Sequence, residues 1–357
     1  MKAAVFRGIG QIEVTDVPRP EPEAGEVLIR VGYCGICGSD LEAFHTGMYE
    51  PGLIIGHEFA GTVVELGPGV GDWRVGDRVV VNDAIPCGAC GPCREGRLDA
   101  CESLTMIGVT HDGAMAEYAR ITADGVYRLP DTVTLRQGAL VEPLTVALHG
   151  VRRSRLKAGD RALVMGAGPI GLLTMQCALL AGARLVAVTE VDATRAALAG
   201  RLGAAAVLDP SHDNVGVALS SLTGGQGPDV VYVCTGAPAP YSDAVSLVRK
   251  GGQIYLLGLC VEPVAADFMS VVMNDLCIEG SLAGRAEFPA AIDLVAQRRI
   301  DVEALVSHEI GLDEVVTAGF HRLDHRQGSG LPSAQAQGTP QPGSGAVKIL
   351  VRIGGES

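Results

Sequence analysis

Short hydrophobic runs separated by glycine-containing turns make up most of the first 147 residues. Runs such as EVLIRVGYCG (26–35) and GDRVVVND (76–83) are rich in β-branched residues and show no long helical period. From about residue 148, hydrophobic runs alternate with helical stretches; these runs are RALVMGAG, RLVAVTE, AAVLDP, DVVYVCTG, GQIYLLGL and LCIEGSLA. The alternation predicts an α/β fold in which a doubly wound parallel sheet follows a β-rich N-terminal region.

The pattern of hydrophobic and polar residues changes again after about residue 285. FPAAIDLVAQRRI (288–300) predicts a helix, and AVKILVRI (346–353) predicts a closing strand. Residues 324–345 lie between them, are dominated by Gly, Ser, Pro and Gln, and contain no aromatic residue. Because such a composition buries too little apolar surface to offset the entropy of ordering, we expect a flexible loop there.

Charge and composition narrow the class of protein. The chain has 357 residues, of which 47% are hydrophobic, and a formal net charge of −13. This charge argues against nucleic-acid and anionic-membrane partners, because no basic surface is available to bind phosphates. The N-terminus shows no apolar export segment, so we expect a cytoplasmic protein with few or no disulfides.

One uncharged stretch, residues 162–183, is long enough to cross a bilayer. It contains glycines and a proline, and it is flanked by the strand and helix patterns of a soluble α/β protein. We therefore expect no membrane partner and interpret the stretch as part of the parallel-sheet domain.

Four cysteines in CGACGPCREGRLDAC form a compact cluster. Cys87, Cys90, Cys93 and Cys101 have the spacing C-x2-C-x2-C-x7-C, which suits tetrahedral zinc. A disulfide between cysteines two residues apart would close a very small ring, and a redox or iron–sulfur role is the remaining alternative. Four protein ligands leave no position for a substrate, so we predict a structural zinc site.

A catalytic zinc would need other ligands and an open position. The candidates are Cys37 in CGICGSD, His57 and Glu58 in IGHEFAG, and Glu142 in LVEPLTVALHG. Sulfur, imidazole and carboxylate ligands from three loops are a set that such a zinc requires. Their joint occurrence predicts a second, catalytic zinc site.

Each of these residues also has a simpler interpretation. Cys34 and Cys37 have the spacing of a redox pair, and Cys37 also fits an ordinary buried thiol. His57 fits a hydrogen-bonded core histidine, and Glu142 fits the cap of a helix opened by Pro143. Only the combination of the three chemistries favours the metal site.

The segment VMGAGPIGLL carries a nucleotide-binding motif. Gly166, Gly168 and Gly171 have the G-x-G-x-x-G spacing, and Pro169 and Ile170 lie within it. The motif follows an apolar strand and opens a helix, where unpaired amides and the helix dipole favour a pyrophosphate.

An acidic residue and a basic residue bear on the choice of nucleotide. Glu190 ends the next strand, 19 residues after Gly171, and would accept hydrogen bonds from the adenosine ribose and repel a 2′-phosphate. Arg195 is the counter-argument, because it can bind a phosphate, the adenine or solvent. The sequence therefore predicts NAD over NADP as the cofactor.

The ordered motifs resemble those of the zinc-containing medium-chain dehydrogenase/reductase family. They are CGICGSD, GHEFAGTVVELGPGV, the four-cysteine loop, VEPLTVALHG, GAGPIGLL and VKILV, and they span essentially the whole chain apart from about 324–345. The glutamate in EPL resembles the polyol branch, which includes sorbitol, xylitol and butanediol dehydrogenases. The segments GALVEPLTVALHGVRRSRLKAGD and EGSLAGRAEF are most similar to butanediol dehydrogenase-like sequences.

The resemblance implies a domain arrangement and an activity. Residues 1–147 and 286–357 would form one catalytic domain similar to the co-chaperonin barrel, with an NAD-binding Rossmann domain inserted at 148–285. The implied activity is reversible oxidation of a secondary alcohol, a diol or polyol similar to 2,3-butanediol, to a ketone by a homodimer or homotetramer with two zinc ions per chain.

The resemblance also implies how the hydroxyl proton leaves the substrate. Zinc would lower the pKa of the substrate hydroxyl, and Ser39 would take its proton. Many relatives have a histidine at position 42, where this chain has Glu42, so Glu42, His45 or water would pass the proton to solvent. Glu58 and Glu142 are both candidates for the acidic zinc ligand, and one of them can act through water.

Four other interpretations remain open. L-threonine dehydrogenase and another sugar-alcohol dehydrogenase are the nearest, although threonine dehydrogenases usually depart from EPL. A zinc-independent quinone or enoyl reductase would lack both the four-cysteine loop and the Cys/His/Glu set. A silent NAD-binding protein would have lost one of Cys37, His57 and Glu142, and all three are present.

Overall fold

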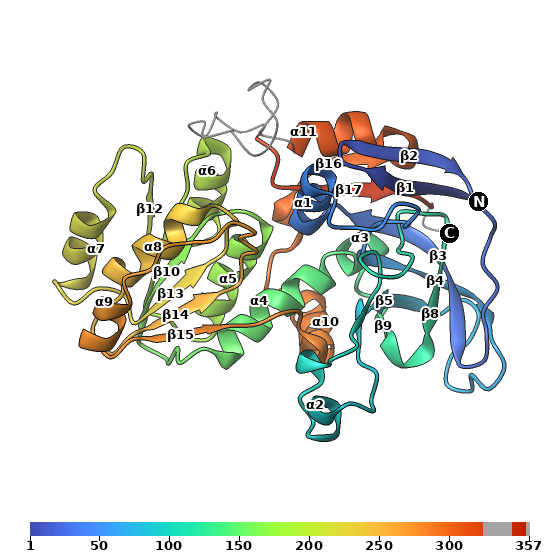
Figure 1. The fold of residues 1–357 in the computed structure, drawn as a ribbon, viewed down its shortest axis with the longest axis horizontal. Coiled ribbons are helices and arrows are strands. Elements are labelled where there is room, and N and C mark those ends of the chain that lie inside the picture. Colours follow the sequence, from blue (N-terminus) through green and yellow to red (C-terminus); the bar gives the residue numbers. More distant parts are fainter. Residues whose placement is uncertain (324–344, 355–357) are drawn as a thin grey trace. The chain divides into compact units, whose positions relative to one another are not determined.

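The computed structural model describes residues 1–323 and 345–354 (Figure 1). The predicted loop at 324–345 lies outside the described residues except for its last position. Contacts divide the chain into two compact units. Unit 1 comprises Met1–Glu142, Phe288–Arg298 and Val306–Ser357, and unit 2 comprises Pro143–Glu287 and Arg299–Leu305.

Unit 1 is built mainly from β-strands. A seven-stranded sheet has the order β16-β17-β3-β4-β5-β9, and β8 also pairs with β3. Its strands are β3 (Glu26–Gly35), β4 (Glu58–Leu66), β5 (Arg78–Val81), β8 (Tyr118–Thr122), β9 (Val126–Arg128), β16 (Val306–Gly311) and β17 (Lys348–Arg352). Two small sheets pair β1 (Lys2–Gly8) with β2 (Gln11–Asp16), and β6 (Ala84–Ile85) with β7 (Thr105–Met106).

The helices of unit 1 are short. They are α1 (Gly38–Thr46), α2 (Gly91–Arg94), α3 (Leu135–Gly138), α10 (Phe288–Ala296), α11 (His321–Leu323) and a π-helix at Val315–Phe320. The C-terminal strand β17 pairs with β3 from the N-terminal part, so the two ends of the chain share one sheet and one core. This pairing joins segments from the first and last parts of the chain in one β-rich unit.

Helix α1 was not expected from the hydrophobic pattern. It begins after Cys37, whose backbone N–H donates to Oδ2 of Asp40 at 3.0 Å, and it ends at Gly47 in the left-handed conformation (φ 74°). Polar capping at one end and a glycine at the other define a helix of nine residues, too short for a clear apolar period.

Unit 2 is a doubly wound parallel sheet with the order β12-β11-β10-β13-β14-β15. The strands are β10 (Arg161–Met165), β11 (Leu185–Thr189), β12 (Ala206–Leu208), β13 (Val230–Val233), β14 (Gln253–Leu256) and β15 (Cys277–Gly280), and every pair is parallel. The helices are α4 (Val141–Arg153), which begins at the end of unit 1, α5 (Pro169–Leu180), α6 (Ala193–Arg201), α7 (Val215–Thr223), α8 (Pro238–Leu247) and α9 (Phe268–Met273). The order confirms the predicted Rossmann topology.

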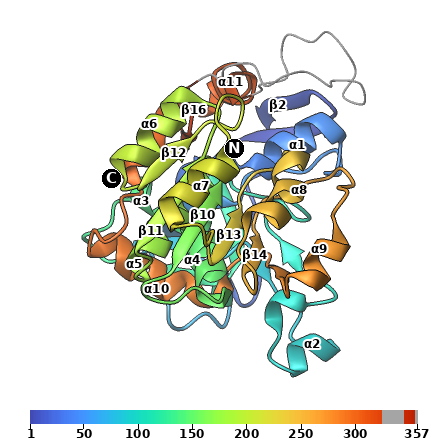
Figure 2. The ribbon, with the colours of Figure 1, turned by 90° about the vertical axis from the view of Figure 1, so that its left-hand side faces the viewer.

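Alternate residues of these strands serve the two faces of the sheet. Leu163 and Val231 pack with Ala244 of α8 in one core cluster. Tyr232, next to Val231, points to the opposite face and shares a 2.7 Å hydrogen bond with Ser154. Helices lie on both sides of the strands in Figure 2, so both faces are covered, and the central strands β10, β11 and β13 are buried and almost entirely apolar. Over residues 1–323 and 345–354, no helix is long and apolar enough to span a membrane.

Candidate metal centres and nucleotide site

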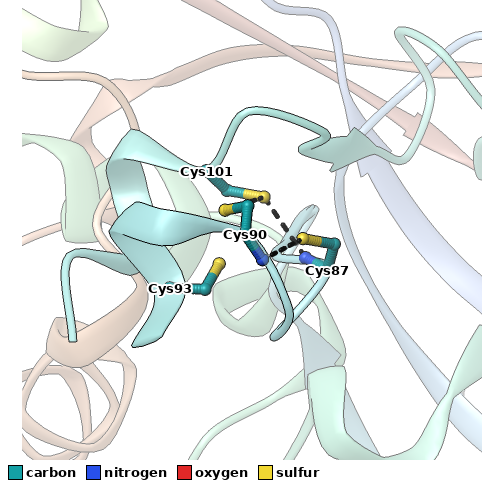
Figure 3. A group of neighbouring side chains, drawn as sticks. All are labelled: Cys87, Cys90, Cys93 and Cys101. Carbon is teal, nitrogen blue, oxygen red and sulfur yellow. Dashed lines mark hydrogen bonds between the residues drawn. The ribbon is translucent and has the colours of Figure 1, made fainter. Parts of the chain in front are cut away.

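The four clustered cysteines lie on a loop between β6 and β7. Cys90 precedes α2, Cys93 lies within α2, and Cys101 follows a short 3-10 turn at Leu98–Ala100. One sulfur from each of the four cysteines falls within 4.8 Å of the others, and Figure 3 shows the side chains converging. All ten cysteines, none of which lies outside the described residues, are free thiols, so the cluster contains no disulfide.

Backbone amides make this loop favourable for thiolates. The N–H groups of Ala89 and Cys90 donate to the sulfur of Cys87 at 3.5 and 3.4 Å, and they lower the pKa of Cys87 to about 6. Burial and the neighbouring Cys90 raise the pKa of Cys93 to about 12. Four thiols this close resist common ionisation unless a cation binds between them, so the donor set fits zinc.

A second group of ligand atoms forms where β3 and β4 meet. Cys37 follows the end of β3, and His57 immediately precedes Glu58, the first residue of β4. Antiparallel pairing places Gly35 opposite Glu58, which brings the end of one strand to the beginning of the other. Single ligand atoms of Cys37, His57 and Glu58 lie within 4.8 Å of one another.

Asp40 connects two members of this group. Its side chain is buried; Oδ2 accepts the backbone N–H of Cys37, and Oδ1 lies 3.8 Å from Nδ1 of His57. The Tyr49 hydroxyl lies 3.4 Å from the same Oδ1. Burial alone would lower the pKa of His57, but the negative charges of Cys37 and Asp40 raise it well above its usual value.

Glu58 is paired with a buried lysine. Its Oε2 accepts a short hydrogen bond from Nζ of Lys348, which also donates to the carbonyl of Ile36 at 3.0 Å. Both side chains are 2% exposed. Burial by itself would lower the pKa of Lys348, but the charges of Glu58 and Cys37 raise it, so the lysine is a cation at this buried position.

Glu142 lies in the first turn of α4 and is buried. The close group formed by the described residues contains Glu58 and does not include Glu142. Burial, Asp83 and Glu58 raise the pKa of Glu142 well above its usual value, despite the opposing effect of His57. Glu142 and Asp83 therefore add two buried carboxyl groups around the Cys37, His57 and Glu58 group.

Three other residues expected near this metal group lie on α1, and a fourth, Cys34, lies in the core. Ser39 is in the first turn of α1 and hydrogen-bonds with Tyr49. Glu42 and His45 are partly buried positions on the same helix. Cys34 is a fully buried core residue, and burial raises the pKa of its thiol well above the usual range, which suits packing and not redox exchange.

These residues fit a zinc ion. Zinc–ligand bonds of about 2.0–2.3 Å put tetrahedral ligands about 3.3–3.8 Å apart, so a group within 4.8 Å needs only a small contraction. Asp40 lies beside Nδ1 of His57 at 3.8 Å, so a small movement would form the hydrogen bond that orients a metal-binding imidazole through its other nitrogen. Three protein ligands, Cys37, His57 and Glu58, would leave a position for substrate.

Sequence reasoning missed Asp40, Asp83, Tyr49 and Lys348. Asp40 had a usable signal, since an acid three residues after Cys37 has the spacing of a helix-capping residue. Lys348 had another, because it is the single charge in the apolar run AVKILV. Asp83 and Tyr49 carry no comparable signal.

The glycine motif joins β10 to α5 with the geometry that a pyrophosphate requires. Gly166 has φ 97°, and a Cβ on Gly171 would lie 1.8 Å from the carbonyl oxygen of Gly166. A Cβ on Gly168 would meet no atom within 4 Å. Gly168 caps α5 without a side chain, so the helix amides face open space where an anion can approach.

Glu190 follows β11 and is tied to this motif. Its Oε2 accepts the N–H of Ala167 at 2.8 Å, and its Oε1 accepts the N–H groups of Val191 and Asp192 at 2.9 Å each. The carboxylate thus fixes the glycine turn and remains beside it. Arg195 is half-buried on α6, where its backbone N–H is capped by Asp192.

A Rossmann sheet, a Cys/His/Glu group and a four-cysteine loop together define the class of zinc-dependent nicotinamide dehydrogenases. Family models support this class: residues 23–131 match the alcohol dehydrogenase GroES-like domain, and residues 169–297 match the zinc-binding dehydrogenase domain.

Individual relatives match over most of the chain. A sorbitol dehydrogenase of Bacillus subtilis is 32% identical over 89% of this chain and 92% of its own length. The (R,R)-butanediol dehydrogenase of the same species is 34% identical over 90% and 96%. A crystal structure of a zinc-binding dehydrogenase from Sinorhizobium meliloti bound to NADP has 34% identity, 98% coverage of both chains and a TM-score of 0.87.

The chain therefore belongs to the zinc-containing medium-chain dehydrogenase/reductase family, in its polyol dehydrogenase branch. It is an enzyme of the zinc-type alcohol dehydrogenase class, and it acts on a small molecule. The resemblance noted from the sequence motifs is confirmed.

Proposed function

We propose that this enzyme reversibly oxidises one secondary hydroxyl of a short diol or polyol to a ketone with NAD. The observation that carries the proposal is the convergence of ligand atoms from Cys37, His57 and Glu58 within 4.8 Å. Relatives named sorbitol and butanediol dehydrogenases support the substrate class.

Cys37, His57 and Glu58 would hold the catalytic zinc, which supplies a Lewis acid that lowers the pKa of a bound hydroxyl. Asp40 would orient His57 in the metal-bound enzyme and, through its other oxygen, holds the backbone at Cys37. Glu142 is the alternative acidic ligand, acting directly or through water. The four cysteines of the loop at 87–101 would hold a second zinc that stabilises the loop.

Ser39 is the residue that we expect to take the substrate's proton. It lies two residues after Cys37, and its hydrogen bond with Tyr49 leads to Asp40. A chain of hydroxyl groups can move a proton without a charged intermediate on Ser39 itself. Glu42 or His45 on the same helix, or water, would complete the path to solvent.

NAD is the cofactor that the nucleotide site favours. Gly166, Gly168 and Gly171 allow close approach of the pyrophosphate, with Pro169 and Ile170 opening α5. The negative charge of Glu190 beside the turn disfavours the 2′-phosphate of NADP. The structure of the Sinorhizobium relative bound to NADP shows that the family does accept that cofactor, and Arg195 is the residue here that would assist it.

The buried carboxyl groups argue for a substrate with more than one hydroxyl. Glu142 and Asp83 lie beside the metal ligands, and an added hydrogen bond to such a group contributes about 0.5–1.5 kcal/mol. A vicinal diol can place one oxygen at the metal and donate its second hydroxyl to this shell. A monohydric alcohol has no second hydroxyl to donate to these carboxyl groups.

The direct test is NAD reduction with 2,3-butanediol, sorbitol, xylitol, L-threonine and 2-butanol. We expect kcat/KM for a diol or polyol to exceed that for 2-butanol by about tenfold or more, because about 1.4 kcal/mol gives that factor. Equal efficiency with 2-butanol would contradict the role of the acidic shell. Activity restricted to L-threonine would assign the enzyme to the threonine dehydrogenase class.

We also propose that the enzyme forms a homodimer or homotetramer. The helix α9 exposes Phe268, Met269, Val272 and Met273 to between 69 and 78%, and β15 is the edge strand of the six-stranded sheet. A second copy would cover this apolar helix and pair with the free edge. Light scattering should therefore show at least a dimer, and Val272→Glu should shift it towards the monomer.

A further inference from the structure

Lys348 is a charged residue in the core of unit 1. It is the first residue of β17, and its side chain is 2% exposed. A buried ammonium group is costly unless its hydrogen bonds are made, and two of them go to Oε2 of Glu58 and the carbonyl of Ile36. These partners are a candidate metal ligand and the residue directly before another, Cys37.

The position of Oε2 is defined from a second side. A Cβ on Gly35 would lie 2.1 Å from Oε2 of Glu58, so the carboxylate occupies the space that a side chain at position 35 would need. Gly35 is also the β-sheet partner of Glu58. The lysine and the glycine therefore hold this oxygen in one place.

A carboxylate can give a metal one oxygen or both. An oxygen that accepts a short, charge-assisted hydrogen bond from a buried ammonium is a poor second ligand, because binding the metal would strip the lysine of its counter-ion. Oε1 is then the oxygen of Glu58 that can turn to the metal.

We propose that Lys348 is a positioning residue that restricts Glu58 to a single metal-binding oxygen and so keeps one coordination position open for the substrate. The proposal rests on the proposed catalytic zinc site. Three ligand atoms, one each from Cys37, His57 and Glu58, leave a tetrahedral ion one open position, whereas a second oxygen from Glu58 would fill it.

A purely structural brace is the competing explanation of Lys348. Such a brace would affect folding or metal retention and would leave the coordination number unchanged. Coordination number is therefore the property to measure, and cobalt(II) in place of zinc reports it, because four-coordinate cobalt absorbs visible light several times more strongly than five-coordinate cobalt.

The experiment compares the visible spectra of cobalt-substituted wild type, Lys348→Met and Lys348→Arg. We expect a strong four-coordinate spectrum in the wild type, a several-fold weaker one in Lys348→Met, and recovery in Lys348→Arg, which restores the charged donor. Zinc affinity, measured by competition with a chelator, should stay equal or increase in Lys348→Met because a repelling cation is removed. In Lys348→Met, azide should bind the cobalt at least tenfold more weakly than in the wild type, because the second oxygen of Glu58 would fill the open position.

Arg161→Met is the matched control, because Arg161 is a buried cation paired with Asp229 at 3.0 Å in unit 2. It should reduce stability and leave the cobalt spectrum and azide binding unchanged. An unchanged spectrum in Lys348→Met, or loss of its metal, would overturn the proposal.

Two measurements on the wild type complete the test: its cobalt spectrum, and its zinc content together with diol oxidation. If Lys348→Met does not fold, the wild-type spectrum decides, since a five-coordinate wild type contradicts an open position. Zinc content and diol oxidation by the wild type test the proposed function separately, so failure of the proposed function is distinguishable from failure of the role of Lys348.

Discussion

Oδ1 of Asp40 lies 3.8 Å from Nδ1 of His57, and the other oxygen of the same carboxylate accepts the N–H of Cys37. One buried acid thus faces a candidate metal-binding imidazole and fixes the turn that carries a candidate thiolate. Loss of such a partner typically costs 10–100-fold in metal affinity or activity.

Asp40→Asn keeps the shape of the side chain and removes its charge. We expect zinc affinity or kcat/KM to fall about 10–100-fold in a protein that melts near the wild-type temperature. Chelator competition and steady-state kinetics measure the two effects. Glu50→Gln, an exposed acid outside α1, is the control that should change neither. Wild-type affinity and kinetics in Asp40→Asn would show that Asp40 has no role in orienting His57.

Glu190→Ser should weaken the binding of NAD and improve the binding of NADP. The substitution removes both the hydrogen-bond acceptor for the ribose and the charge that repels a 2′-phosphate. The ratio of kcat/KM for NAD to that for NADP should fall by about tenfold or more, and the exposed Glu262→Ser should leave it unchanged. Part of the decrease in kcat/KM with NAD will come from a less rigid glycine turn, since the N–H of Ala167 loses its hydrogen bond to Glu190. A parent enzyme that already uses both cofactors equally would contradict the role assigned to Glu190.

Zinc binding to the metal-free enzyme should strengthen as pH rises. Burial raises the pKa of Glu142 and Asp83, and the charges of Cys37 and Asp40 raise that of His57 above its usual value despite burial. These shifts favour the protonated form of each group in the metal-free state, and a bound cation displaces the protons. Chelator competition between pH 6 and 8 should show affinity rising about tenfold per pH unit for each proton released. Affinity independent of pH would show that the acids around the site are already ionised.

The glycine motif and the strands of unit 2 could be predicted because their signals are local. The spacing of Gly166, Gly168 and Gly171 directly reflects the close approach that the turn requires. The central strands β10, β11 and β13 are buried on both faces, so each appears as a nearly continuous apolar run.

The surroundings of the metal group could not be predicted, because they depend on long-range pairing. Lys348 contacts Glu58 across 290 residues, through the pairing of β17 with β3 and of β3 with β4. From the sequence alone, Glu58 and Glu142 are both candidates for the acidic zinc ligand. The β3–β4 pairing brings only Glu58 into the close group of described residues. No local pattern encodes that difference.

The proposed function requires two zinc sites with separate roles, one in chemistry and one in stability. Zinc content, melting temperature and activity of Cys37→Ser and Cys90→Ser test it together, with each variant serving as control for the other. We predict two zinc ions per chain in the wild type. Cys37→Ser should keep the zinc of the four-cysteine loop, remain folded and lose activity, whereas Cys90→Ser should melt at a lower temperature and aggregate.

The most direct single measurement is the metal analysis of wild type and Cys37→Ser side by side. We predict a decrease from two zinc ions per chain to one, accompanied by loss of diol oxidation without unfolding. One zinc in the intact wild-type chain, or a Cys37→Ser enzyme that still oxidises diols at the wild-type rate, would contradict it.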